Sequence, residues 1–156
     1  MSSNRFWLLK SEADDYPIEF LERDGRTCWD GVRNYQARNS MRDDMQVGDM
    51  VLFYHSNADP SGVAGVARVC RPAYPDHTAF DKNHVHFDPK STVEKPTWMM
   101  VDVEFVERFP AILSLDQLRK TKGLEDLLVL KRGQRLSVMP VIEAHFEIIR
   151  KLGAAR

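Results

Sequence analysis

Cysteine is scarce in this chain of 156 residues, and long apolar runs are missing. The two cysteines, Cys28 and Cys70, are too few for a disulfide framework or a cysteine-based zinc site. No run approaches the roughly 20 apolar residues of a membrane span, and the run at residues 6–9 is too short for the core of a signal peptide. We therefore expect a cytoplasmic protein with reduced thiols and no membrane partner.

Catalytic signatures are missing as well. The sequence has no glycine-rich phosphate loop and no Gly-x-Ser-x-Gly nucleophile elbow. His84 and His86, two residues apart, could chelate a metal together with Asp81 or Asp88, but no further ligand spacing supports such a site. We expect no cofactor, no metal and no catalytic residue, and the sequence leaves open whether these two histidines bind a metal.

Net charge is also small. The chain carries 22 Lys and Arg against 23 Asp and Glu, a formal charge of −1, which argues against strong nonspecific binding of nucleic acid. The segment 119–137 is nevertheless basic, with Arg119, Lys120, Lys122, Lys131, Arg132 and Arg135 against two acids. This strip could hold a phosphate backbone weakly, or it could be an ordinary solvated surface.

The hydrophobic pattern predicts one domain, residues 1–156, of the α+β class. Strands are predicted at residues 5–10, 27–30, 50–54, 63–69, 97–109 and 134–139. Helices are predicted from Pro17 to Gly25, from Asn34 to about Arg42, from Ser114 to Gly123, at 124–130 and at 141–152. Because strands and helices do not alternate as βαβ units, a mixed barrel is favoured over a doubly wound sheet.

Several residues carry more specific expectations. Ile18, Phe20 and Leu21 are predicted to form the buried face of the first helix, and Ile142, Phe146 and Ile149 that of the last. Gly65 predicts a β-bulge or a close backbone approach. Residues 72–96 hold four prolines and little periodicity, which predicts a long loop.

The segment Trp29–Asn39 holds the densest functional chemistry. Its two aromatics, Trp29 and Tyr35, can stack on a flat ligand, and its asparagines can recognise a hydrogen-bonding edge. Arg33 and Arg38 can hold anions or can serve the fold. A nucleobase on its phosphate backbone would satisfy all three types of group.

Polar residues also follow two predicted strands and lead into a third. Lys10-Ser11-Glu12 ends the first strand, and His55-Ser56-Asn57 ends the third. Arg132 and Arg135 flank a Gly-Gln pair before Ser137, which suits phosphate contact. Abrupt polarity at a strand end can build a site on a rigid scaffold, although each segment could equally be a simple turn.

Taken together these segments resemble the EVE domain family. The resemblance rests on Trp7–Glu12, Trp29–Asn39, Phe53–Asn57, Ala73–Asp76, Trp98–Val103 and Arg135–Val138, in order along nearly the whole chain. It implies a PUA-like fold, a bent β-barrel of about five to six strands with short helices around it, and kinship to YTH domains.

The resemblance also implies a function and a site. EVE domains are thought to recognise modified bases, chiefly modified cytosines in DNA and to a lesser extent bases in RNA. By analogy with YTH domains the base pocket would be lined by Lys10, Ser11 and Trp29, and completed by Asn34, Tyr35, His55, Ser56 and Ser137. Ser11 and Asn34 would recognise the polar edge of the base, while the phosphates would be held by Arg33, Arg38, Lys131, Arg132 and Arg135.

The leading hypothesis is thus a non-enzymatic module that binds nucleic acid carrying a modified base, with DNA favoured over RNA. One alternative is an RNA-binding module without preference for modification, and a weaker one is an enzyme acting on nucleotides. The identity of the base, the oligomeric state and the cellular role stay open at this point.

Overall fold

The computed structural model describes residues 4–131 and 136–155. The strands are β1 (Phe6–Glu12), β2 (Arg26–Trp29), β3 (Met50–Ser56), β4 (Gly62–Pro75), β5 (Met99–Ser114) and β6 (Val138–Val141). The α-helices are α1 (Ile18–Asp24), α2 (Tyr35–Asn39), α3 (Leu115–Arg119) and α4 (Glu143–Ala154). A π-helical turn (Ser40–Asp44) follows α2, and 3-10 turns occupy His77–Phe80 and Leu128–Leu130.

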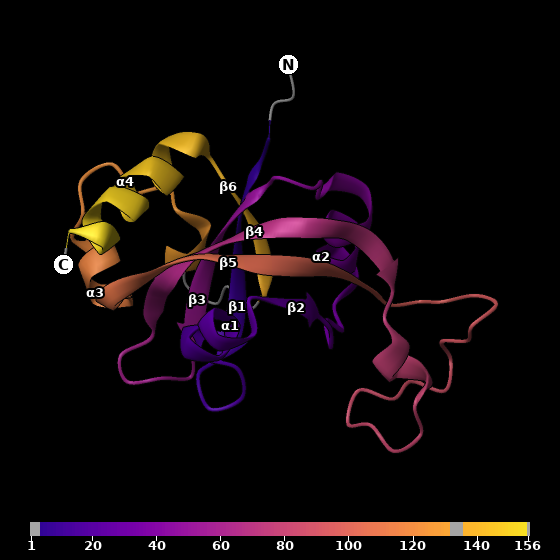
Figure 1. Ribbon diagram of the computed structural model, residues 1–156. Helices are drawn as coiled ribbons and strands as arrows, with labels where there is room; N and C mark the ends of the chain where they lie inside the picture. Colours follow the sequence, from indigo (N-terminus) through magenta and orange to yellow (C-terminus); the bar gives the residue numbers. More distant parts are fainter. Residues whose placement is uncertain (1–3, 132–135, 156) are drawn as a thin grey trace.

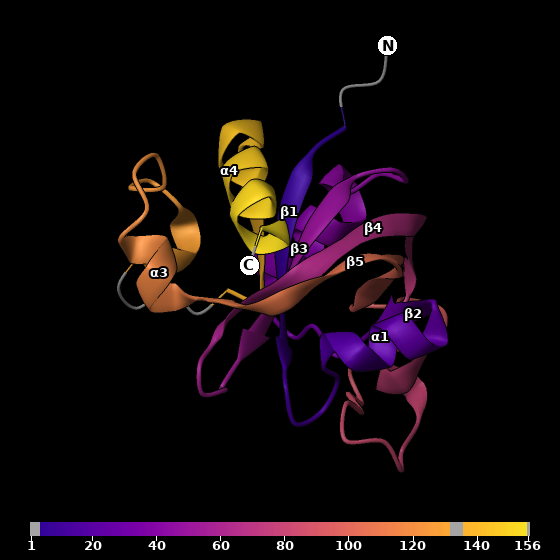
Figure 2. The same ribbon diagram turned by 60° about the vertical axis from the view of Figure 1, so that its left-hand side comes forward.

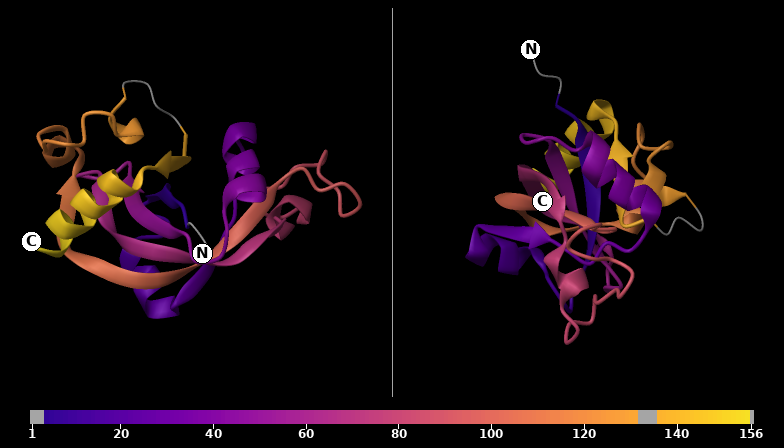
Figure 3. Two further views of the ribbon diagram at one scale, coloured as in Figure 1. Left: turned by 90° about the horizontal axis from the view of Figure 1, so that it is seen from above. Right: turned by 90° about the vertical axis from the view of Figure 1, so that its right-hand side faces the viewer.

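The six strands form one mixed sheet in the order β2-β5-β4-β3-β1-β6, with β1 and β3 parallel and the other pairs antiparallel. Seen from above, the long strands β4 and β5 form an arc whose far end carries the loop before β5 (Figures 1 and 3). This bend confirms the predicted α+β fold on a bent sheet of about six strands. Within residues 4–131 and 136–155 no ladder joins β2 to β6, so the sheet is not closed.

Both faces of the sheet are covered, because α1 lies on one side and α3 and α4 on the other (Figure 2). Alternate residues of β1 and β3 enter different cores: Leu9 and Phe53 pack with α1, whereas Leu8 and Leu52 pack with α3 and α4. All four side chains are fully buried. The prediction that the strand at 50–54 is covered on both faces is confirmed.

Local sequence signals correctly predicted three helix ends and one irregularity in a strand. Gly25 ends α1 with a φ of 81°, where a side chain would be strained. Asn34 caps α2 by accepting from the Ala37 backbone N–H at 3.0 Å, and Ser114 and Gln117 form the predicted capping box of α3. The register of β4 shifts next to Gly65, where a Cβ would lie 2.3 Å from the Glu107 carbonyl oxygen.

The prediction of burial is wrong for two residues. Phe20 is 39% exposed, because it lies two positions after buried Ile18 and therefore points away from the same helix face. Ile142 is 61% exposed, because it lies between β6 and α4 and precedes the first turn of the helix. Phe146 and Ile149 are buried as expected.

Several boundaries also differ from the expectation. β4 continues to Pro75, since the last of four register shifts against β5, between Arg71 and Tyr74, removes Pro72 from the regular pairing. The predicted long loop is thus shorter, and β5 runs on to Ser114. β6 begins at Val138 and includes Pro140, which an edge strand tolerates; part of the predicted strand 134–139 lies outside the described residues.

In the described part of the chain, none of the helices has the length and apolar character needed to cross a bilayer.

Candidate nucleic-acid interface

A cavity of about 350 Å³ opens where the end of β1, the loop into α1 and residues 27–29 of β2 come together. Such a volume lies within the range of roughly 300–1,000 Å³ typical of small-ligand pockets. It is lined by Lys10, Ser11, Glu12, Asp15, Tyr16, Thr27, Cys28, Trp29, Asp30 and His86. Three predicted pocket residues, Lys10, Ser11 and Trp29, thus meet in one cavity.

Trp29 serves the core and the cavity together. Its backbone ends β2 opposite Val101, and its ring meets Phe53 edge-on, with 5.4 Å between ring centres. Only 8% of the residue is exposed. The side chain is therefore held rigidly by packing, and a limited part of it contributes to the wall of the cavity.

Lys10 and Ser11 are positioned by the parallel pairing of β1 with β3. The Ser11 hydroxyl donates to the Tyr16 carbonyl oxygen at 2.7 Å, so its oxygen retains only acceptor capacity toward a ligand. Burial lowers the pKa of Lys10 below its ordinary value. Cys28 also faces this cavity, and burial raises the pKa of its thiol, which leaves it protonated and a weak nucleophile at neutral pH.

Asp76, a buried carboxylate, holds together the segments that carry Asp30 and His86 of the cavity wall. It accepts hydrogen bonds from the Gly31 N–H at 2.8 Å, from Arg33 Nη1 at 2.9 Å and from both the backbone and the hydroxyl of Thr78. Burial alone would raise the pKa of Asp76, but the hydrogen bonds from Thr78, Gly31 and Arg33 outweigh it and lower the pKa. Arg33 in turn donates to the His86 carbonyl oxygen at 2.8 Å and fastens the loop beside β2.

Arg33 thus has contacts that serve the fold, and its predicted contact with phosphate stays a prediction. Arg38 is similarly engaged, since it donates to the Thr97 carbonyl oxygen at 2.9 Å and to Asn39. Tyr35 lies beside these arginines and outside the cavity lining: its exposed ring stacks on Trp98, with 5.0 Å between ring centres. The amide oxygen of Asn34 is occupied by its capping hydrogen bond.

His55, Ser56 and Ser137 do not line the cavity with Trp29. His55 is buried beneath the start of α1, where its Nε2 accepts from the Ile18 N–H at 3.0 Å. Ser56 ends β3 opposite Glu12. Ser137 contributes its carbonyl oxygen to the Lys10 N–H at 2.9 Å, so it positions Lys10 through the backbone.

The position of His55 predicts a pH dependence of stability. Burial lowers the pKa of His55 below its ordinary value of 6.5, against a smaller opposing effect of Glu19. Above pH 6.5 the ring is neutral in both states and its hydrogen bond is kept. As the pH falls below 6.5 the unfolded chain binds the proton first, so the contribution of His55, about 1 kcal/mol for one hydrogen bond, is progressively lost. Urea unfolding at pH 7.5 and 5.5 should show this loss.

His55→Gln keeps an acceptor that does not titrate, so this variant should lose less stability between the two pH values than the wild type. His77→Gln, at an exposed histidine, is the matched control and should behave as the wild type. Identical pH dependence in all three proteins would contradict this role of His55.

Three predicted phosphate-binding residues remain, and the structure describes only one of them. Lys131 is exposed after the last 3-10 turn, and among residues 4–131 and 136–155 it forms no ion pair. Arg132 and Arg135 lie outside the described residues, so their predicted role stays a prediction.

Seven residues of the cavity wall were not among the predicted pocket residues, including Glu12 at the end of β1 and His86. Asp15 and Tyr16 come from the loop into α1, Thr27 and Cys28 from β2, and Asp30 follows it. The alternation of β2 could have indicated Thr27 as a wall residue, whereas the approach of His86 to Gly31 depends on a contact across 55 positions that no local pattern encodes.

Comparison with known proteins places this chain in a family. A family model described as the EVE domain matches residues 5–152. Thymocyte nuclear protein 1 of Homo sapiens is 40% identical over a match that covers 94% of this chain and 72% of that protein. A hypothetical protein from Leishmania major has a TM-score of 0.93 and 46% identity, covering 98% of this chain and 96% of that chain.

A further solved structure shows human THYN1 protein in complex with DNA containing 5-methylcytosine. It has a TM-score of 0.87 and 40% identity, and the match covers 96% of this chain and 98% of that chain. The agreement of fold, sequence and family match extends over almost all of the chain. This protein therefore belongs to the EVE domain family.

Proposed function

We propose that this protein binds nucleic acid and holds one extruded base, a modified cytosine, in the cavity beside Trp29. The observation that carries the proposal is the cavity itself, which joins an aromatic wall to Lys10 and several carboxylates. The complex of human THYN1 with DNA containing 5-methylcytosine supports the ligand class. Extrusion into a pocket is the usual way in which a protein reaches a base inside a duplex.

The charges of the cavity favour a base over a phosphate. Glu12, Asp15 and Asp30 line it together with Lys10, so negative groups outnumber the lysine and would repel a phosphate. Phosphates would instead lie outside, near exposed cations such as Lys131. The same carboxylates are acceptors for the exocyclic amino group of cytosine, whereas thymine and uracil present a carbonyl oxygen at that position.

The wall also offers apolar surface for a 5-methyl group. Trp29 and Tyr16 present aromatic carbon, and Thr27 presents a methyl group. Contact between apolar side chains and the methyl group of a pyrimidine is a known means of recognition. The proposal assigns recognition to these residues and no chemical step, in agreement with the raised pKa of the Cys28 thiol.

A binding panel tests the proposal. Fluorescence anisotropy would compare duplexes that carry one central 5-methylcytosine, cytosine or thymine with RNA of the same sequence. The 5-methylcytosine duplex should bind most tightly. Equal binding of unmodified RNA would favour the RNA-binding alternative, and a change in the mass of the oligonucleotide after incubation would indicate an enzyme.

Lys10→Met is expected to weaken binding of the modified duplex about tenfold or more, because a hydrogen bond from a charged group contributes about 1.5–3 kcal/mol. Lys122→Met makes the same chemical change at an exposed residue outside the cavity and should leave discrimination unchanged. If both variants lose the same small amount of affinity, Lys10 acts only through general charge and does not touch the base.

A further inference from the structure

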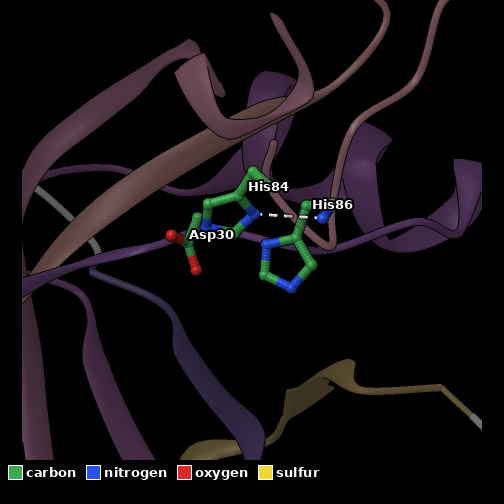
Figure 4. A group of neighbouring side chains, drawn as sticks. All are labelled: Asp30, His84 and His86. Atoms are coloured by element: carbon green, nitrogen blue, oxygen red, sulfur yellow. Dashed lines mark hydrogen bonds between the residues drawn. The ribbon is translucent and has the colours of Figure 1, made fainter. Parts of the chain in front are cut away.

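Three side chains at the edge of the cavity form a cluster, and of these the base-binding proposal uses only Asp30. Asp30 follows β2, while His84 and His86 lie on the loop between β4 and β5. One ring nitrogen of each histidine and one carboxylate oxygen of Asp30 all lie within 4.8 Å of one another. Figure 4 shows the Asp30 carboxylate next to the His84 ring, with His86 beside it. All three residues are half-buried.

The backbone holds this cluster in place. Gly31 has a φ of 76°, and a Cβ there would lie 2.4 Å from the nearest ring atom of His86, so the histidine packs directly on the main chain. The His86 carbonyl oxygen is held by Arg33, and the His86 N–H donates to Nδ1 of His84 at 3.0 Å. Two segments far apart in the sequence are thus fixed against each other.

The His84 ring must change tautomer to bind a metal. Nδ1 of His84 accepts the His86 N–H, so Nε2 carries the proton of the neutral ring; coordination through Nε2 requires the proton to move to Nδ1 and this hydrogen bond to be given up. Asp30 has neither a hydrogen bond nor an ion pair among residues 4–131 and 136–155. An unpartnered, half-buried carboxylate beside two imidazoles is a favourable place for a cation.

The carboxylates suggested by the sequence are engaged elsewhere. Asp81 accepts from the Asn83 N–H at 2.9 Å, and Asp88 accepts from Trp98 Nε1 at 2.7 Å. The third potential ligand is therefore Asp30, more than 50 positions away from His84. No ligand-spacing rule could have identified it.

We propose that Asp30, His84 and His86 bind one divalent transition metal ion of the zinc class. Two imidazoles and one carboxylate are a donor set that suits Zn²⁺, which takes His nitrogen and Asp oxygen at about 2.0–2.2 Å. In a tetrahedral site the ligand atoms are about 3.3 Å apart, so small side-chain rotations would complete it. Asp30 and His86 also line the cavity, which leaves the fourth position facing it for water.

Calorimetric titration of untagged, EDTA-stripped protein with zinc chloride tests the site without any nucleic acid, so its outcome is independent of the proposed function. The wild type should bind one equivalent. His84→Gln and Asp30→Asn should each weaken zinc binding by at least about 100-fold, because the loss of a ligand costs more than the roughly 10- to 100-fold that the loss of an outer-shell partner costs. His77→Gln changes an exposed histidine of the same loop region and should bind zinc as the wild type does.

Two further measurements distinguish loss of the metal site from loss of the fold. Circular dichroism establishes that each variant is folded, and zinc should raise the melting temperature of the wild type and leave that of the His84→Gln, His86→Gln double variant unchanged. Co²⁺ in place of Zn²⁺ should give the intense visible bands of a tetrahedral site without thiolate charge transfer. Zinc binding that is equal in wild type and double variant, or that is lost in Cys28→Ser, would overturn the proposal.

Discussion

Asp76→Ala is expected to lower the free energy of unfolding by about 3–5 kcal/mol, the usual cost of breaking a buried ion pair by removing one partner. The carboxylate is fully buried and accepts from Gly31, Arg33 and Thr78. Its removal leaves two backbone N–H groups without an acceptor and the Arg33 guanidinium, 25% exposed, without a counter-ion. Urea unfolding followed by tryptophan fluorescence measures the loss.

Asp43→Ala is the matched control, because Asp43 pairs with Arg42 at the surface. An exposed ion pair contributes at most about 1 kcal/mol. Asp76→Asn should be intermediate, since its amide oxygen still accepts while the charge is lost. If Asp76→Ala unfolds at the same urea concentration as Asp43→Ala, the carboxylate does not anchor the loop.

The importance of Asp76 was not visible in the sequence, and the reason is physical. Asn34 and Ser114 act within three residues of themselves, so cap chemistry and spacing were enough to predict both. Asp76 acts on Gly31 and Arg33, more than 40 positions away. Only the pairing of β2 and β4 with β5 brings these segments together.

The predictions for the candidate site also depend on whether a residue's partner is local or distant in the sequence. The resemblance placed Lys10, Ser11 and Trp29 correctly in one cavity, because each lies at a fixed position of a strand end. His55 likewise lies near the end of a strand, β3, and pairs in register with Ser11, yet its ring accepts from the first N–H of α1 and not from a ligand. Polarity at a strand end therefore indicates that a side chain needs a partner, and the partner can be a helix N-terminus as readily as a ligand.

Trp29→Ala is expected to abolish the preference for 5-methylcytosine over cytosine. Stacking of a base on an aromatic side chain contributes about 1–3 kcal/mol, so affinity for the modified duplex should fall roughly 10- to 100-fold. Binding that depends on phosphate contacts, and is therefore sensitive to salt, should remain. Anisotropy titrations at two salt concentrations with modified and plain duplexes would separate the two contributions.

Because Trp29 is also a core residue, the same variant should lose about 3–5 kcal/mol of stability, and a control must match that loss. Leu118→Ala removes a fully buried side chain from the core on the opposite face of the sheet, at a cost of about 2–5 kcal/mol, and Leu118 does not line the cavity. Measured where circular dichroism shows both variants to be folded, Leu118→Ala should keep the preference that Trp29→Ala loses, and Trp29→Phe should keep part of it. A folded Trp29→Ala protein that still distinguishes the two duplexes would contradict stacking on Trp29; Tyr16→Ala, at the other aromatic residue of the described cavity wall, would then show whether the base lies in this cavity at all.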